Sequence, residues 1–129
     1  MRKGFRGSLT AALVMGLVAA AYPASPEKVE ILIRDVLESE RPGPHGDSLW
    51  LLLERNVYRL KFHCEATRSR RPDALVALGR GYELLGKRYR ERLDSAVFLG
   101  NQPRADSLRV SLSALSSHIA TLDSLRQSP

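Results

Sequence analysis

A helical pattern of apolar residues runs without a break from Pro72 to Leu99 and limits the folds open to this chain. Apolar and small residues recur there every three or four positions, which places them on one side of an α-helix. Pro72 suits the first turn of a helix, and Gly100 suits its C-terminal stop. The predicted buried face consists of Leu75, Leu78, Gly79, Tyr82, Leu85, Gly86, Tyr89, Leu93 and Val97.

The same segment contains three glycines, Gly79, Gly81 and Gly86. A glycine inside a helix costs about 1 kcal/mol relative to alanine. Gly79 and Gly86 lie on the predicted buried face, so we expect a neighbouring helix to approach closely beside them. Gly81 lies off that face, and the pattern gives no reason for it.

Three other segments show helical periodicity. Ser25, Pro26 and Glu27 supply an N-cap, a first-turn proline and an acidic group near the positive end of a helix. Asp47 is the expected N-cap of the next helix. The sequence therefore predicts an all-α fold, an irregular bundle of three long helices and one shorter one. The expected helices cover residues 26–40, 48–67, 72–99 and 104–126.

The expected helix over residues 48–67 has two apolar stripes. The first consists of Leu49, Leu52, Leu53, Val57, Leu60 and Cys64. Leu51, Tyr58 and Phe62 form the second, roughly opposite the first. This helix therefore either lies between two neighbours or presents Leu51, Tyr58 and Phe62 as an exposed patch that binds a partner.

The last expected helix carries apolar residues at alternating steps of four and three, the spacing of a coiled-coil seam. These residues are Leu108, Leu112, Leu115, Ile119 and Leu122. The seam could pack within the same bundle or join two copies of the chain, so a homo-oligomer stays open.

The N-terminus has the pattern of a signal peptide. Three basic residues precede an apolar run of about 13 residues, and Ala19 and Ala21 match a cleavage site after Ala21. The sequence predicts removal of residues 1–21, export to the periplasm or another extracytoplasmic space, and a helical domain over residues 22–129. The alternative is an uncleaved membrane anchor over residues 7–24.

Charge is distributed unevenly along the chain. Three of the 20 basic residues lie in the leader, which leaves 17 against 14 acidic residues in the expected domain. Residues 54–92 are basic and residues 22–53 are acidic, which indicates either an acidic helix packed beside a basic one or a basic face for an acidic protein or anionic membrane. Nucleic acid is not an expected partner, because export would separate the protein from nucleic acid and no known nucleic-acid-binding module is present. The candidate basic residues are Lys87, Arg88, Arg90 and Arg92.

The segment over residues 75–89 resembles the first helix of a tetratricopeptide repeat. The matching residues are Leu75, Leu78, Gly79 and Tyr82, with Gly86, Tyr89 and Pro103 near later positions of the motif over residues 75–103. Glu91 or Arg92 stands where that family has a small alanine. The resemblance implies binding of a protein or peptide on a concave helical surface, without catalysis.

Candidate residues for other chemistry are few. Cys64 is the only cysteine, so the domain has no internal disulfide, and its place on an apolar stripe predicts burial. His45, His63 and His118 are the candidates for a ligand-binding or metal-responsive sensor, although no ligand spacing joins them. We therefore expect no cofactor, no metal and no enzymatic activity. The sequence predicts an interaction module that serves as an accessory subunit of an envelope or membrane-associated assembly.

Overall fold

The structure is a computed structural model that describes residues 25–39, 44–69 and 71–127. The predicted leader over residues 1–21, its cleavage after Ala21 and the alternative anchor over residues 7–24 lie outside the described residues. Within the described ranges, none of the helices combines the length and the apolar character needed to span a bilayer.

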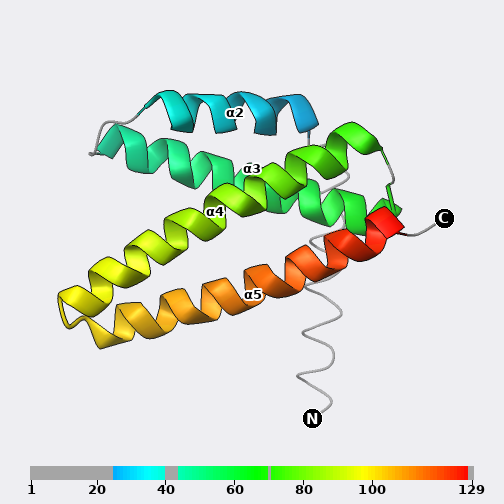
Figure 1. The fold of residues 1–129 in the computed structure, drawn as a ribbon. Coiled ribbons are helices and arrows are strands. Elements are labelled where there is room, and N and C mark those ends of the chain that lie inside the picture. Colours follow the sequence, from blue (N-terminus) through cyan, green and yellow to red (C-terminus); the bar gives the residue numbers. More distant parts are fainter. Residues whose placement is uncertain (1–24, 40–43, 70, 128–129) are drawn as a thin grey trace, which may run out of the picture.

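The described part of the chain contains four helices and no strand, which confirms the all-α fold with three long helices and one shorter one (Figure 1). The helices are α2 (Pro26–Glu38), α3 (Pro44–Thr67), α4 (Pro72–Phe98) and α5 (Gln102–Gln127). Ser25 is the N-cap of α2, as predicted, because its hydroxyl accepts a hydrogen bond from the Lys28 N–H at 3.3 Å. Helix α3 begins at Pro44, so the prediction that Asp47 caps it is wrong.

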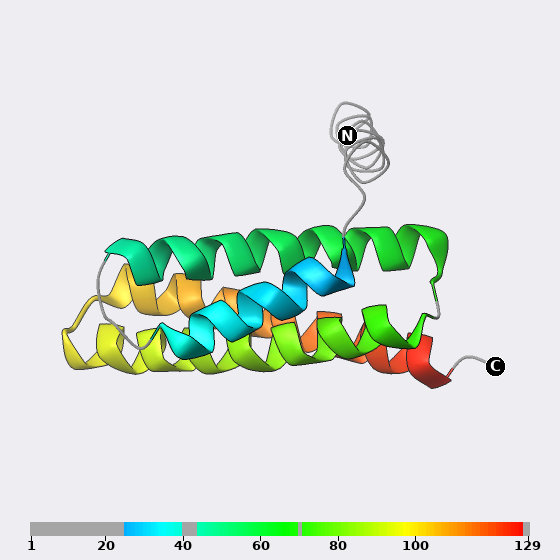
Figure 2. The same ribbon diagram turned by 90° about the horizontal axis from the view of Figure 1, so that it is seen from above.

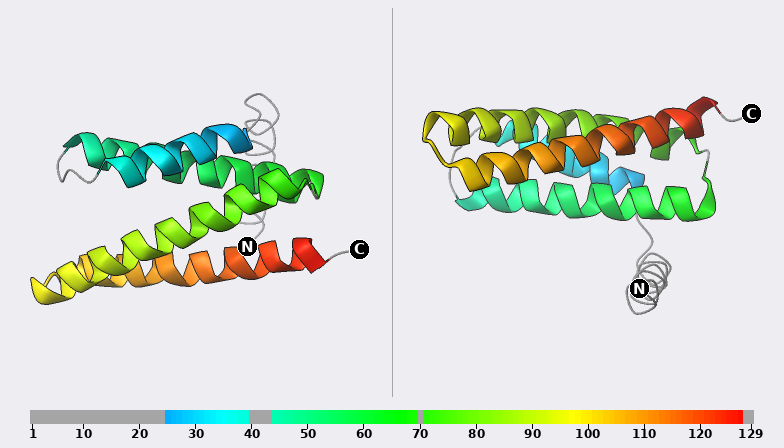
Figure 3. Two further views of the ribbon diagram at one scale, coloured as in Figure 1. Left: turned by 45° about the horizontal axis from the view of Figure 1, so that its top comes forward. Right: turned by 90° about the horizontal axis from the view of Figure 1, so that it is seen from below.

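Helix α4 is the central element, because it packs against each of the other three helices. Helices α2 and α3 lie side by side, and α4 slopes across them in the view of Figure 1. From above, α2 runs diagonally between α3 and α4 (Figure 2). Helix α5 returns antiparallel along α4, on the side away from α2 (Figure 3). A helix with three neighbours needs a wide apolar face, which explains the unbroken pattern of residues 72 to 99.

The core lies where α2, α3 and α4 meet. Leu53, Val57, Leu60 and Cys64 of α3 are completely buried, which confirms most of the first stripe and the predicted burial of Cys64. Leu52 is 44% exposed, so its assignment to that stripe is wrong. Tyr82 and Leu85 bring α4 into the same cluster, and Leu115 and Leu122 bring in α5.

The glycines of α4 point in different directions. A Cβ on Gly81 would lie 2.6 Å from a methyl carbon of Val57, so α3 lies close to α4 at the glycine that the sequence pattern left unexplained. The expectation that Gly81 lies off the packed face is wrong. Gly86 does face a neighbouring helix, because a Cβ there would lie 3.3 Å from Leu115 of α5.

Two helices end with a residue in the left-handed region of backbone space. Helix α4 ends at Gly100, with φ +69°, and the N–H groups of Gly100 and Asn101 donate to the carbonyls of Val97 and Ala96 at 3.1 and 2.8 Å. This is the Schellman arrangement that glycine favours. Helix α3 ends in the same way at Arg68, with φ 48°, and the Ser69 N–H donates to the Cys64 carbonyl at 2.9 Å.

Substitutions at these two positions should change the free energy of unfolding in opposite directions. Gly100→Ala should lower the free energy of unfolding by about 1 kcal/mol, because a side chain is strained at positive φ. A Cβ there would meet no other atom within 4 Å, so the cost is conformational. Arg68→Gly should raise the free energy of unfolding by up to about 1 kcal/mol, less the entropy that glycine adds to the unfolded chain. Urea unfolding of both variants measures the pair, and a gain in stability for Gly100→Ala would contradict this account.

Candidate interaction surface

The three residues of the predicted apolar patch do not lie together on the surface. Leu51 is 48% exposed, whereas Tyr58 and Phe62 are half-buried. The Tyr58 ring meets the His118 ring of α5 edge to face, with 5.7 Å between centroids, and thus fills space between α3 and α5. The prediction of one exposed patch of Leu51, Tyr58 and Phe62 is wrong, because the second of them packs inside the bundle.

The predicted basic segment is partly neutralised by α3. Arg88 and Arg92, one turn apart on α4, both donate to one carboxylate oxygen of Asp47, at 2.8 and 3.3 Å. Arg80 pairs in the same way with Glu30 of α2 at 3.1 Å. These ion pairs confirm the interpretation that the acidic segment packs beside the basic one.

Leu51, Arg88 and Arg92 do meet, in a cavity of about 320 Å³ between α3 and α4. The Arg88 guanidinium lies over the Trp50 ring, 5.1 Å from its centroid, a cation–π arrangement. The buried Nε–H of Arg88 has no acceptor among the described residues. The cavity is lined by Asp47, Trp50, Leu51, Glu54, Leu85, Arg88, Tyr89 and Arg92.

A hydrogen bond closes one side of this cavity. The Tyr89 hydroxyl donates to Glu54 at 3.0 Å. Burial, a hydrogen bond with Tyr58 and the nearby Glu54 carboxylate raise the pKa of Tyr89, so the hydroxyl keeps its proton at neutral pH. The side chains that line the cavity therefore join α3 to α4, with Arg88 and Arg92 balanced by Asp47 and Glu54. Sequence patterns did not predict the contributions of Trp50 and Glu54.

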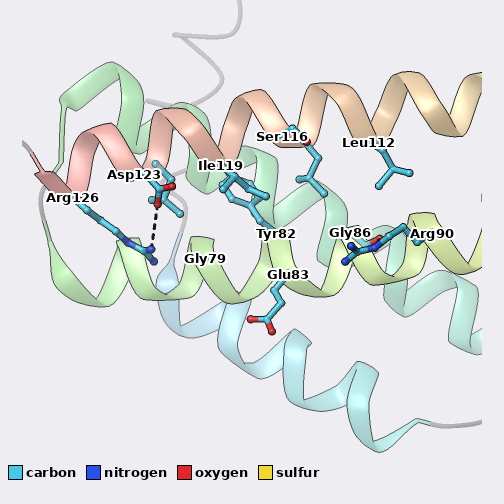
Figure 4. Close-up of a pocket in the computed structure, with 12 residues that line it drawn as sticks. Gly79, Tyr82, Glu83, Gly86, Arg90, Leu112, Ser116, Ile119, Asp123 and Arg126 are labelled. Atoms are coloured by element: carbon cyan, nitrogen blue, oxygen red, sulfur yellow. Dashed lines mark hydrogen bonds and ion pairs between the residues drawn. The ribbon is translucent and has the colours of Figure 1, made fainter.

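The other two predicted basic residues lie elsewhere. Lys87 is exposed, and Arg90 lies beside a groove between α4 and α5, where its Nε donates to the Gly86 carbonyl at 3.3 Å (Figure 4). Thus Arg88 and Arg92 line one cavity, and Arg90 lines a different groove. They do not form one basic patch.

The groove between α4 and α5 has a volume of about 340 Å³. Figure 4 shows Arg126 reaching from α5 to α4 beside Gly79, where its Nη2 donates to the Leu75 carbonyl at 3.3 Å. Gly79 therefore makes room for this guanidinium group. The groove is lined by Gly79, Tyr82, Glu83, Gly86, Arg90, Leu112, Leu115, Ser116, Ile119, Leu122, Asp123 and Arg126.

Three consecutive exposed apolar residues lie at the tip of the α4–α5 hairpin. Val97 is 54% exposed, Phe98 89% and Leu99 75%, so the prediction that Val97 is buried is wrong. Consecutive helical residues point about 100° apart, and one neighbouring helix cannot cover all three. Figure 1 places this turn at the far end of the hairpin from the C-terminus. Three apolar residues directly before Gly100 were the sequence signal for this tip.

The side chains of His63 and His118 are described by the structure, and neither belongs to a group that could hold a metal ion. The described residues include no group of three or more His, Cys, Asp or Glu side chains placed to hold a metal ion. His63 is on α3, His118 is on α5, and the side chain of His45 is not among those described. Burial raises the pKa of the Cys64 thiol, which keeps it protonated at neutral pH.

His118 is enclosed by residues from two other helices. Its ring contacts Tyr58 of α3 and Tyr82 of α4, with 5.7 and 6.3 Å between centroids. Burial lowers the pKa of His118, and Lys61 lowers it further, while Glu65 acts in the opposite direction. Lys61 is itself buried and donates to Glu65 at 3.1 Å.

This environment predicts a pH dependence of stability. The pKa of His118 is lower in the folded state than in the unfolded state, where it is about 6.5. Its contribution is therefore fully present above that value and is lost as the pH falls through the folded pKa. We expect the free energy of unfolding to be smaller at about pH 5.5 than at about pH 7.5. Urea unfolding at both values should show this fall, and His118→Gln should reduce it; an unchanged fall in that variant would assign the effect to other groups.

Comparison of the chain with protein-family models, with curated proteins and with solved structures finds no significant match.

Proposed function

We propose that this chain is a non-enzymatic helical interaction module, an accessory subunit of an envelope or membrane-associated assembly, and that it binds its protein partner through the α4–α5 tip. The observation that supports this most is that Val97, Phe98 and Leu99 are exposed side by side at the C-terminal end of α4. Scattered single apolar residues are common on protein surfaces, whereas contiguous ones mark interaction sites.

The tip is held in one conformation before any partner arrives. Two backbone hydrogen bonds close the turn around Gly100, and the Asn101 side chain accepts from the Arg104 N–H at 3.3 Å, which caps α5. Ala96 and Ala105 are buried on either side of the turn. A preorganised apolar surface loses little conformational entropy on binding, so more of its burial contributes to affinity.

The charges near the tip favour a protein partner over an anionic membrane. Asp94 and Asp106 lie within the same few turns as Arg92 and Arg104, so the two signs are mixed around the apolar residues. Attraction to an anionic membrane needs an excess of basic residues. A partner with an apolar pocket and a polar rim fits this surface better.

The extracytoplasmic location in this proposal rests on residues 1–21, whose pattern is that of a secretory leader. The amino-terminal mass of the protein from cells, together with its distribution between membrane and soluble fractions, tests it. A mass that includes Met1 in a cytosolic fraction would remove the envelope assembly from the proposal and leave the tip as its binding site.

Phe98→Asp tests the tip directly. The side chain is 89% exposed, so the substitution should leave thermal unfolding and helical content unchanged while it reduces recovery of the co-purifying partner at least about tenfold. Val110→Asp is the matched control, because Val110 is 70% exposed on α5 and outside the tip. Equal recovery with wild type and Phe98→Asp would overturn the proposal.

A further inference from the structure

Arg88 uses only part of its hydrogen-bonding capacity in the cavity between α3 and α4. Its Nη2 donates to Asp47 at 2.8 Å, whereas its buried Nε–H has no acceptor among the described residues. A carboxylate that meets a guanidinium group side-on accepts two parallel hydrogen bonds. Arg71 forms such a pair, because its Nε and Nη2 donate to the two oxygens of Asp73 at 3.2 and 2.7 Å. Asp47 therefore takes one of the two donors that Arg88 offers to a side-on carboxylate.

The contact of Asp47 with α4 is weak. Its Oδ1 also accepts from Nη2 of Arg92 at 3.3 Å, and its side chain is 61% exposed, against 24% for Arg88. An exposed ion pair favours the paired state by about fivefold at most. Asp47 also lies in the first turn of α3, where the helix dipole stabilises a carboxylate without any arginine. It can therefore leave both guanidinium groups at little cost in free energy.

The rest of the cavity suits a small apolar group beside a carboxylate. The Arg88 guanidinium lies over the Trp50 ring, 5.1 Å from its centroid, and this contact restricts the orientation of its donors. Trp50, Leu51 and Leu85 form the apolar part of the lining. The volume of about 320 Å³ is near the lower end of the range for small-molecule sites. Such a volume suits one small ligand or one terminal residue of a peptide.

The charges of the cavity limit its ligand to a single carboxylate. Arg88 and Arg92 face two acids, Asp47 and Glu54, and Glu54 accepts a hydrogen bond from the Tyr89 hydroxyl at 3.0 Å. If one carboxylate from outside takes the place of Asp47, two basic groups still face two acidic ones. A second acidic group on the ligand would have no basic partner in the cavity, and Glu54 would repel it.

We propose that this cavity binds a monocarboxylate that carries an apolar group, and that Asp47 occupies the carboxylate position in the free chain as a competitor. The ligand carboxylate accepts from Nε and Nη2 of Arg88 and from Arg92. Its apolar group lies against Trp50 and Leu51. A free apolar acid and the C-terminal residue of a peptide share this chemistry. The inference goes beyond the proposed binding at the hairpin tip and uses different residues.

Tryptophan fluorescence measures binding at this cavity directly, because Trp50 is the only tryptophan of the chain. The purified full chain is titrated with 3-phenylpropionate, a free acid, and with acetyl-Gly-Gly-Phe, a peptide with a free carboxylate. Each probe is compared with its amide, which has the same apolar group and no charge. We expect a saturable change in fluorescence with an acid and none with its amide. Binding of only one acid would support the site and identify its source as a small acid or a peptide terminus.

Two substitutions should change the affinity in opposite directions. Asp47→Asn removes the competing carboxylate and should lower the dissociation constant of the acid about fivefold, because more of the chain is then ready to bind. Arg88→Lys keeps the positive charge but lacks the paired donors, and should raise the dissociation constant at least about tenfold. If Arg88→Lys does not fold, Arg92→Lys tests the second guanidinium group at a more exposed position.

A second ion pair between α4 and a neighbouring helix provides matched controls. Arg80 donates to Glu30 of α2 at 3.1 Å, and neither residue lines this cavity. Glu30→Gln and Arg80→Lys make the same chemical changes as the two test variants, and both should bind the acid as wild type does. A gain in affinity in Glu30→Gln equal to that in Asp47→Asn would assign the effect to net charge and contradict the competition.

Three results would overturn the carboxylate site: no saturable change with either acid up to about 10 mM, equal affinity for an acid and its amide, or an Asp47→Asn chain that binds no more tightly than wild type. The site and the hairpin tip can fail separately. Loss of acid binding in Arg88→Lys with normal recovery of the protein partner refers to the cavity alone, and the reverse result in Phe98→Asp refers to the tip alone.

Discussion

Tyr82→Ala is expected to lower the free energy of unfolding by about 3–5 kcal/mol, the range for removal of a buried aromatic ring. Tyr82 is only 2% exposed, belongs to the central cluster and contacts the His118 ring. Its loss would open a cavity on the helix that joins all the others. Against a total stability of about 5–15 kcal/mol, this is a large fraction.

Urea unfolding of Tyr82→Ala and Tyr82→Phe separates the ring from its hydroxyl. No hydrogen bond of the Tyr82 hydroxyl is formed within the described residues, so Tyr82→Phe should change the free energy of unfolding by less than about 1 kcal/mol. A similar loss in both variants would show that the hydroxyl, and not the packed ring, stabilises the fold. A loss of less than about 1 kcal/mol in Tyr82→Ala would place Tyr82 outside the core.

Gly81→Ala is expected to lower the free energy of unfolding by about 1–3 kcal/mol, although alanine is the better helix former. The added Cβ would lie 2.6 Å from one methyl carbon of Val57 and 3.3 Å from the other. Val57 is completely buried and β-branched, so it has little freedom to move aside. Relief of this contact would require α3 and α4 to separate.

Gly79→Ala is the matched control, two residues away on the same helix. Its Cβ would lie 2.5 Å from Nη2 of Arg126, the far end of a flexible side chain that can move into solvent. This substitution should therefore leave stability unchanged or raise it by up to about 1 kcal/mol. Chemical unfolding of the two variants side by side measures the difference, and equal losses would refute close packing specific to Gly81.

The helices of this chain were predictable from local chemistry. Prolines, glycines and the Ser25 cap set their approximate bounds, and the spacing of apolar residues gave the number of helices and most of the core. The start of α3 was missed because Pro44 is tolerated in a first turn, and the carboxylate of Asp47 pairs with Arg88 and Arg92 of α4 instead of capping the helix. That pairing depends on contacts 41 and 45 residues apart, which no local pattern contains.

The candidate surface was predictable only in part. Sequence identified Leu51, Arg88 and Arg92 but gave no reason to place them in one cavity with Trp50. Gly81 was misjudged because the helical wheel assumed one buried face, whereas α4 packs against α3 and α5 from different sides. Val97 continues the apolar spacing of α4 and is exposed because the neighbouring helices do not cover it at the turn. In each case the arrangement of the helices in space determines whether the residue is buried, exposed or part of the cavity.

Under the proposed function, the apolar tip of Val97, Phe98 and Leu99 is where this chain contacts its protein partner. In-cell photocross-linking tests it most directly, with a photoreactive phenylalanine analogue at position 98 and, in a second strain, at position 110. We expect one discrete cross-linked protein at position 98, absent at position 110 and lost when Leu99→Asp is added. No cross-link at position 98, or the same products at both positions, would contradict the claim.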